Sequence, residues 1–226
     1  MHGAWHGPWC WERVTPLLDA RGTSWSAVDL PSMDVHAGYV TDVHADAAAL
    51  RTALDRLDGQ AIVLGHSYGG MVITEGAARH PNVRGLVYLA AFMPDTGESL
   101  NHLMAQAPNP ALAAALRTSD DGRMTLAEDI VGPGFYNDCD DATVRWAAER
   151  LRPMLSSAIE PVRAAAWHDV PSTYVVCAQD RAIFPELQRS MSRRASSVVE
   201  WDTSHSPFAS RPELVADLLE ALSTHT

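Results

Sequence analysis

One serine in this chain stands between glycines, directly after an apolar run and before a helical pattern. Residues 61–76 read AIVLGHSYGGMVITEG, and residues 65–69 match the G-x-S-x-G pattern of a nucleophile elbow. Glycines fit such a strained turn because a side chain on either flank would collide with neighbouring backbone. The turn lifts the serine oxygen clear of the strand, so the pattern predicts Ser67 as a nucleophile. The alternative is an ordinary serine in a tight turn.

A serine hydroxyl is a weak nucleophile alone, and it needs a base and an orienting carboxylate later in the chain. Asp180 follows the apolar run STYVVCAQ, and His205 follows the run SSVVEW just before the last helical pattern. Both stand where predicted strands end, at the sheet edge where α/β active sites form. The alternatives are a turn residue for Asp180 and a surface histidine for His205. Asp95 is a reserve candidate for the acid, and Asp202 is a weaker one because it lies close to His205 in sequence.

Two backbone amides are expected to bind the negative oxygen that forms during attack by the serine. The residue after the nucleophile, Tyr68, supplies the first amide. The stretch HGAWHGPWCW supplies the second, most plainly from Ala4, because His2 and Gly3 open a loop that leads into a helix near Trp11.

Short apolar runs alternate with helical patterns, which predicts an α/β fold with a mostly parallel sheet and helices on both faces. Five strands are expected, at residues 24–30, 61–65, 83–90, 173–178 and 197–202. Leucines recur at helical spacing in two places: Leu50, Leu54 and Leu57, and then Leu214, Leu218 and Leu222.

Residues 95–170 interrupt this alternation, with no clear central strand and with helical pieces at residues 111–117 and 143–151. We therefore expect a core domain of residues 1–94 and 171–226 and a helical lid of residues 95–170. Aromatic side chains of the lid either line a pocket or form a small core of their own, and tryptophans of the first loop either line its mouth or pack on the helix. Five side chains are expected at the substrate site: Trp5, His6, Phe135, Trp146 and Phe208.

Charge and composition limit the partners of the chain. The net charge of −11 and the pI near 5.2 disfavour nucleic acid and anionic membranes, which require clustered cations, and favour a neutral small substrate. The sequence contains no lysine, which excludes Schiff-base and Ser-Lys chemistry. Three widely separated cysteines indicate neither a metal site nor a disulfide framework, and no membrane span or secretion signal is visible. A cytoplasmic location is expected.

The chain resembles the α/β-hydrolase family, in the branch of plant methyl esterases, hydroxynitrile lyases and related bacterial esterases, at five successive stretches: HGAWHGPWCW, GHSYGGMV, LAAFMPD, YVVCAQDRAIFPELQR and SHSPF. They span almost the whole chain in the family order, and only the lid is loosely matched. The resemblance implies a serine hydrolase without a cofactor. It implies a triad of Ser67, Asp180 and His205, with Ala4 and Tyr68 as oxyanion donors.

Two departures separate the chain from the lyases of this family. The resemblance favours Asp180 over Asp95 as the acid. The lyases typically carry a lysine beside the catalytic histidine and a threonine in the first loop, and those positions match Ser206 and Ala4 here. Both differences favour the esterase branch.

A third departure concerns the sheet. In this family an apolar strand precedes the HG loop and lies between the strands that match residues 24–30 and 61–65. Here Met1 directly precedes His2 and Gly3, so this interior strand is apparently missing. Its loss would leave two rows of buried backbone groups unpaired. Either the sheet closes up or another segment fills the gap, and we expect the natural chain to be longer at this end.

The expected function is hydrolysis of a small carboxylic ester through an acyl-enzyme, with an apolar or aromatic acyl group. The alternatives are a C–C bond lyase or hydrolase, a thioesterase that docks a carrier on the arginines of residues 189–194, and a non-catalytic small-molecule receptor. Nothing in the sequence indicates an oligomeric state.

Overall fold

The computed structural model describes residues 1–34, 42–155 and 160–224. Its main sheet has four strands in the order β1-β2-β6-β7, and every neighbouring pair is parallel. The strands are β1 (Ala61–His66), β2 (Val83–Leu89), β6 (Ser172–Cys177) and β7 (Ser197–Trp201). Four of the five predicted strands are therefore confirmed, and no bound shifts by more than one residue.

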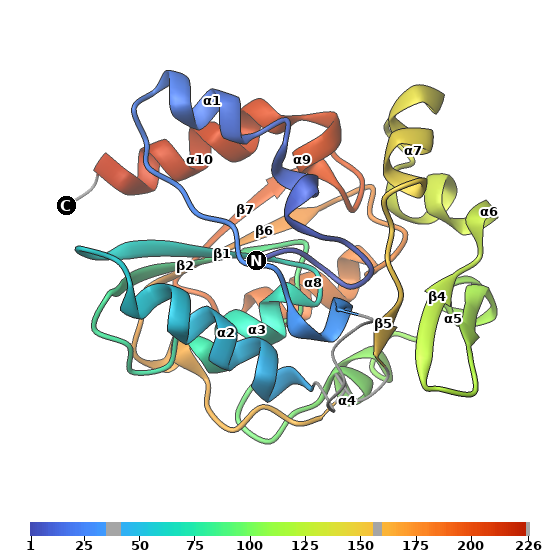
Figure 1. The fold of residues 1–226 in the computed structure, drawn as a ribbon, viewed down its shortest axis with the longest axis horizontal. Helices are drawn as coiled ribbons and strands as arrows, with labels where there is room; N and C mark the ends of the chain where they lie inside the picture. Colours follow the sequence, from blue (N-terminus) through green and yellow to red (C-terminus); the bar gives the residue numbers. More distant parts are fainter. Residues whose placement is uncertain (35–41, 156–159, 225–226) are drawn as a thin grey trace.

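Helices cover both faces of this sheet, as predicted (Figure 1). One face carries α1 (Thr15–Ala20), α9 (Pro207–Ser210) and α10 (Pro212–Thr224). The other face carries α2 (Val43–Asp55), α3 (Gly69–Gly76) and α8 (Pro185–Ser192).

Strand β2 shows why the central strands read as continuous apolar runs. Leu86 and Tyr88 pack in the same cluster as the residues of α2 and α3, whereas Val87 and Leu89 pack in the cluster that contains Val215 of α10. Successive side chains of a strand point to opposite faces, so a strand buried on both faces needs apolar residues at every position.

The predicted strand at residues 24–30 is wrong. This segment carries no strand assignment, and among the described residues no backbone group of residues 24–28 pairs with another backbone group. A strand exists only beside a hydrogen-bonded neighbour about 4.8 Å away. Its expected neighbour, the interior strand, is not present among the described residues, so the segment stays extended but unpaired.

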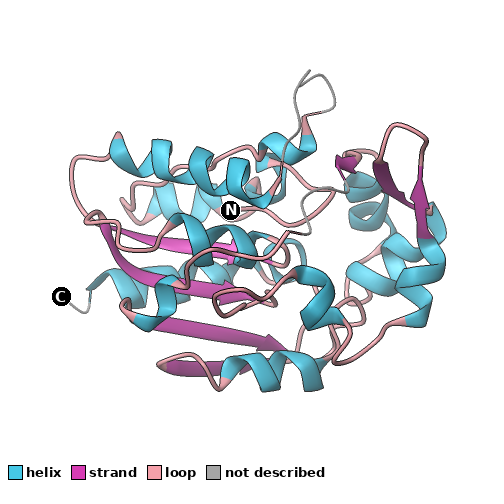
Figure 2. Ribbon diagram, turned by 90° about the horizontal axis from the view of Figure 1, so that it is seen from below, coloured by secondary structure: helices cyan, strands magenta, loops and turns pink. Residues whose placement is uncertain are grey.

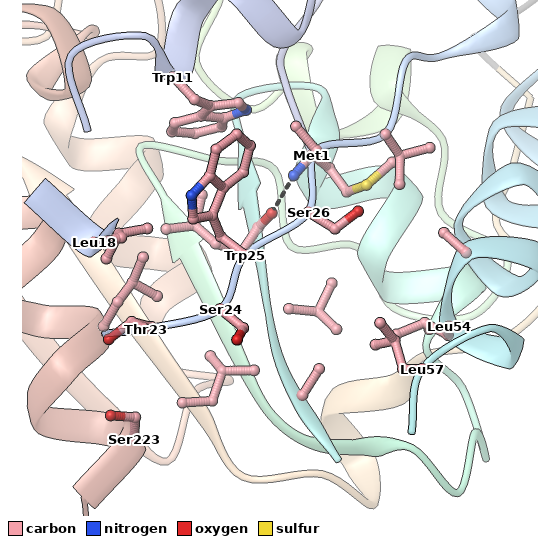
Figure 3. Close-up of a pocket in the computed structure, with 18 of the residues that line it drawn as sticks. Met1, Trp11, Leu18, Thr23, Ser24, Trp25, Ser26, Leu54, Leu57 and Ser223 are labelled. Carbon is pink, nitrogen blue, oxygen red and sulfur yellow. Dashed lines mark hydrogen bonds between the residues drawn. The ribbon is translucent and has the colours of Figure 1, made fainter. Parts of the chain in front are cut away.

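A cavity of about 490 Å³ lies between this extended segment and β1 (Figure 3). Met1 closes one end of it, where its nitrogen donates to Leu64 O and its carbonyl accepts from His66 N. Backbone groups of alternate residues face the same edge of a strand. The edge of β1 that pairs with Met1 at Leu64 and His66 therefore also turns the backbone of Ile62 toward the cavity. Among the described residues, therefore, no segment fills the gap expected from the sequence.

Residues 95–170 lie mostly beyond the carboxyl ends of the four strands, whereas their last part, from residue 160, leads back to the start of β6 (Figure 2). They contain the helices α4 (Leu100–Met104), α5 (Pro110–Ala115), α6 (Glu128–Ile130), η3 (Val131–Phe135), α7 (Asp141–Ala148) and η5 (Ala166–His168). Residues 156–159 of the predicted lid fall outside the described residues.

The expectation of a purely helical lid needs a correction. A second, antiparallel sheet is formed in the order β3-β4-β5 by β3 (Leu116–Thr118), β4 (Arg123–Leu126) and β5 (Met154–Leu155). These strands are too short for an alternating pattern to be visible in the sequence.

Candidate active site

Ser67 stands at the sharp turn from β1 into α3, with a φ of +53° that side chains rarely adopt. Its carbonyl accepts from Gly70 N at 3.0 Å and from Phe92 N at 3.1 Å, and these two bonds hold the turn. A Cβ atom on Gly65 would lie 2.6 Å from Gly69 O, and one on Gly69 would lie 2.7 Å from His2 O. The glycines of the motif are therefore a steric requirement of this elbow.

Asp180 and His205 come from the two strands at the other end of the sheet. Cys177 and Trp201 pair in register at the ends of β6 and β7, and the two side chains follow them in the next loops. His205 Nδ1 lies 2.6 Å from Asp180 Oδ2, and both side chains are buried. A buried carboxylate beside Nδ1 keeps the proton on that nitrogen and leaves Nε2 as the basic atom of the ring.

The Asp180 carboxylate is held in place by three more donors. Its Oδ1 accepts from the amides of Ala182 and Ile183 at 2.7 and 3.0 Å, and its Oδ2 accepts from Gln188 Nε2 at 2.7 Å. Gln188 is buried on α8, and its own Oε1 accepts from Cys177 N at 2.9 Å. The sequence analysis missed this residue, because a glutamine on an amphipathic helix carries no signal of its tertiary partner.

His66 is a second residue that the motif did not single out. It is fully buried, and its Nε2 donates to His205 O at 2.8 Å. Burial holds the pKa of His66 well below its usual value, so the ring is neutral. The carbonyl bond fixes the backbone of His205, while no polar group among the described residues is bonded to His205 Nε2. Such bonds often tighten only when substrate is present.

The loop that contains Ala4 lies against the elbow. A Cβ atom on Gly3 would lie 2.8 Å from Ser67 Cβ, so the two backbones are in close contact. Within the described part of the chain, neither Ala4 N nor Tyr68 N donates a hydrogen bond to another protein group. Two amides are therefore available beside the serine, as an oxyanion hole requires.

The reserve acids make other contacts. Asp95 accepts from His168 Nε2 at 2.8 Å, a bond that lowers the pKa of this carboxyl, and both side chains are well exposed. Asp202 accepts from Gln179 Nε2 at 2.7 Å. Among the described residues only Asp180 binds the His205 ring, so neither reserve residue takes its place.

Three of the five predicted pocket residues gather around the two histidines. Phe208 is fully buried, with its ring edge-on to His66 at 4.9 Å between centroids. Phe135 lies edge-on to His205 at 5.3 Å. His6 packs against Phe208 at 5.9 Å, and burial lowers its pKa to about 3, so it is neutral. Its ring bonds Ala4 O and the hydroxyl of Tyr136, each at 2.7 Å.

The two remaining pocket candidates differ. Trp5 adopts a φ of +62° and donates from Nε1 to Met124 O at 3.1 Å, which links the first loop to β4. Trp146 packs instead against Trp9 at 5.1 Å and beneath the guanidinium of Arg13. The structure therefore brings Trp5 to the site and places Trp146 outside it, because α7 turns this side chain toward the first helical turn of the chain.

The site is closed in this structure. Ser67 is 8% exposed and His205 is 0% exposed. Neither the cavity beside β1 nor a second cavity of about 420 Å³ between Trp5 and α7 is lined by Ser67, Asp180 or His205. Substrate entry therefore requires movement of the residues that cover the carboxyl ends of the strands.

The described residues meet the requirements of neither a metal-ion site nor a membrane-spanning helix. Within residues 1–34, 42–155 and 160–224, no three His, Cys, Asp or Glu side chains gather in a way that could bind a metal ion. In the same ranges no helix combines the length and apolar character needed to cross a membrane.

The chain belongs to the alpha/beta hydrolase family, whose model matches residues 1–218. It is 28% identical to Methylesterase 2 of Arabidopsis thaliana, over 99% of this chain and 94% of that protein. It is 30% identical to the alpha/beta hydrolase nvfD of Aspergillus novofumigatus, over 96% of this chain and 92% of that protein.

Solved structures agree with this assignment. The crystal structure of a pyrethroid hydrolase from Sphingobium faniae JZ-2 matches with a TM-score of 0.87 at 26% identity, over 99% of this chain and 95% of that chain. Polyneuridine aldehyde esterase matches at 21% identity with a TM-score of 0.82, which supports the fold alone. The α/β-hydrolase fold and the resemblance to the methyl esterase branch are confirmed.

Proposed function

We propose that this protein is a serine esterase that hydrolyses a small carboxylic ester through an acyl-enzyme on Ser67. The observation that carries the proposal is the buried hydrogen bond of 2.6 Å between His205 Nδ1 and Asp180 Oδ2. Methylesterases among the relatives support the same reaction class.

In the first half-reaction, Ser67 Oγ attacks the ester carbonyl carbon while its proton passes to His205 Nε2. Asp180 keeps Nδ1 protonated and stabilises the imidazolium as it forms. The carbonyl oxygen becomes an oxyanion that accepts from the amides of Ala4 and Tyr68. Collapse of this tetrahedral intermediate breaks the C–O bond, and His205 returns the proton to the leaving alcohol.

In the second half-reaction, water attacks the acyl-enzyme and gives a proton to His205 Nε2. A second oxyanion forms in the same hole and collapses to the carboxylic acid, and the proton returns to Ser67 Oγ. Every proton that moves therefore passes through one nitrogen atom, which is the ring nitrogen directed away from Asp180.

The surroundings of the site favour an uncharged substrate. The side chains of Phe135 and Phe208 are apolar, and the His6 ring is neutral because burial lowers its pKa to about 3. No group among them would stabilise a charged acyl chain, so an apolar or aromatic acyl group fits best. The relatives named methylesterases favour a small alcohol as the leaving group.

The thiols are in keeping with a cytoplasmic location, which we include in the proposal. Cys10, Cys139 and Cys177 form no disulfide. Burial raises the pKa of Cys10 and Cys177, so both remain protonated and unreactive. Separate thiols of this kind suit a reducing compartment.

Labelling with a fluorophosphonate probe tests the proposal, because the probe reacts only with an activated serine. We expect wild-type protein to be labelled and Ser67→Ala to remain unlabelled. Ser119→Ala, a change at an exposed serine, is the matched control and should be labelled like wild type. A folded wild-type protein that takes no label, and that hydrolyses no member of a panel of aryl and methyl esters, would contradict the proposal.

A further inference from the structure

His2 is a buried polar residue to which the mechanism above gives no part. Its side chain is fully buried, and both ring nitrogens are within bonding distance of backbone groups. Nδ1 lies 2.9 Å from Gly3 O, and Nε2 lies 3.2 Å from Leu30 N. An amide N–H can only donate, so Nε2 must accept from Leu30. The proton of the neutral ring therefore sits on Nδ1, which donates to Gly3 O.

Asp29 competes for the same ring. Its Oδ1 lies 3.2 Å from His2 Nε2, where it would favour a proton on that nitrogen. A proton on Nδ1 lets the ring make two bonds, to Gly3 O and from Leu30 N, whereas a proton on Nε2 would keep only the bond to Asp29. Asp29 keeps other donors in either case, because Arg152 donates from NH1 to Oδ2 at 3.0 Å and from NH2 to Oδ1. Burial is the largest influence on the ring and lowers the pKa of His2, which keeps it neutral.

The bond to Gly3 O acts on an amide of the predicted oxyanion hole. Gly3 C=O and Ala4 N–H belong to one planar trans peptide group and point in opposite directions. Holding the carbonyl toward His2 therefore directs the Ala4 N–H to the other side of the loop. Glycine has no Cβ to restrict its backbone, so this peptide group would rotate readily without such a restraint. The additional bond from His6 N to Gly3 O is long, at 3.3 Å.

We propose that His2 is a positioning residue for the oxyanion hole: its Nδ1–H holds the Gly3–Ala4 peptide group so that the Ala4 amide can donate to the oxyanion. This inference rests on the proposed esterase function. The other neutral tautomer, with the proton on Nε2 toward Asp29, would turn a lone pair of Nδ1 against Gly3 O. That tautomer would release the peptide group. The role of His2 therefore depends on its proton being on Nδ1 and not on Nε2.

Two near-isosteric variants separate this role from simple packing. The side-chain nitrogen of asparagine lies close to the position of Nδ1, whereas the amide of glutamine lies close to the position of Nε2. We expect His2→Asn to keep kcat within about 5-fold of wild type. We expect His2→Gln to lower kcat by about 100-fold with little change in KM, the size typical of losing one oxyanion donor.

A transition-state analogue identifies the step that is affected. An aryl trifluoromethyl ketone forms a tetrahedral adduct on Ser67 and places an oxyanion in the hole, so its affinity should fall for His2→Gln in parallel with kcat. Equal kcat values and equal analogue affinities for the two folded variants would overturn the inference. Fluorophosphonate labelling of wild type would still report on the esterase function, so the two proposals can fail separately.

A measurement on the wild-type protein covers the case in which a variant does not fold. The ¹⁵N chemical shifts of the His2 ring distinguish a protonated nitrogen from a bare one. We expect Nδ1 to be protonated and Nε2 to be bare at neutral pH. A ring that is protonated on Nε2 would overturn the inference.

Discussion

At the scale of single residues, the Asp180 carboxylate accepts four hydrogen bonds, and only one of them comes from His205. The other three bonds orient the carboxylate independently of the histidine. This arrangement separates the residue that touches the base from those that hold it. Replacing the carboxylate with an amide of the same shape therefore tests the contribution of the Asp180 charge directly.

Asp180→Asn should keep the fold and lower kcat by about 10⁴-fold, because an amide can donate to Nδ1 and so stabilise the wrong tautomer of His205. Steady-state kinetics on an aryl ester measure the effect. Asp95→Asn is the matched control, because Asp95 bonds His168 on the surface. A larger loss for the control than for Asp180→Asn would contradict the assignment of the acid.

Asp46 on α2 predicts a pH dependence of stability. Its buried carboxylate accepts from Ser32 N, Ser32 Oγ and Tyr68 Oη at 2.9, 2.6 and 2.7 Å. Desolvation nevertheless raises its pKa from 3.8 to about 6. The folded state therefore binds this proton more tightly than the unfolded state does. Its contribution to stability is fully present below about pH 4 and is lost as the pH rises through about 6.

Urea unfolding of wild type and Asp46→Asn between about pH 4 and 7 measures this contribution. The free energy of unfolding of wild type, relative to the variant, should fall across that range by the order of 3 kcal/mol, less to the extent that the bonds from Ser32 and Tyr68 relax. Parallel pH profiles for the two proteins would show that Asp46 has an ordinary pKa.

At the scale of elements, the two sides of β1 are paired to different extents. β2 pairs with β1 along its whole length, whereas on the other side Met1 is the only described residue that pairs, through Leu64 and His66. The apolar cavity of about 490 Å³ next to Ile62 continues this incomplete edge (Figure 3). A segment that paired with this edge of β1 would therefore stabilise the folded protein.

Adding Val-Val-Leu-Val before Met1 should raise Tm by several degrees. Met1 lies opposite Gly65, so at about 3.3 Å per residue four added residues would run back along β1 from Leu64 to Ala61 and bury apolar side chains in the cavity. Calorimetry or circular dichroism measures Tm. A Gly-Ser-Gly-Ser extension, which offers the same backbone without apolar side chains, should give a smaller change. Equal Tm values for the two extensions would show that the cavity does not accept a strand.

At the scale of the whole molecule, residues 95–170 are tied to the first loop at two points, Met124 and Arg152. Met124 O accepts from Trp5 Nε1, and Arg152 donates from its backbone to Trp5 O at 2.7 Å. The Arg152 guanidinium also donates to His6 O and binds Asp29. Opening of this segment must break such bonds, and opening is required because Ser67 and His205 are buried.

Arg152→Ala should therefore speed labelling of Ser67 by a bulky fluorophosphonate relative to a small one, by several-fold. Second-order labelling rate constants for the two probes give this ratio. Arg150→Ala is the control, because among the described residues the Arg150 side chain contacts Trp146 and Glu149 of the same segment. An unchanged ratio for Arg152→Ala would mean that these bonds do not limit access.

The sequence by itself determined the features that depend on neighbours in the chain. The elbow around Ser67 is visible because its turn requires glycines within a few residues. The central strands β2 and β6 are visible because burial on both faces requires continuous apolar runs. Asp180 and His205 are visible as candidates because each follows such a run. The fold follows from these local patterns and the family from the resemblance of five stretches, and the comparisons confirm both.

Only the tertiary structure decided the features that depend on distant partners. Residues 24–30 have the composition of a strand but lack a neighbour to pair with. Trp146 has the chemistry of a pocket residue, but the orientation of α7 turns it toward Trp9. Gln188 and His2 could not be recognised because a hydrogen bond is defined by the position of both groups. The sequence names the residue that carries one group, but it does not show which distant group lies beside that residue in the fold.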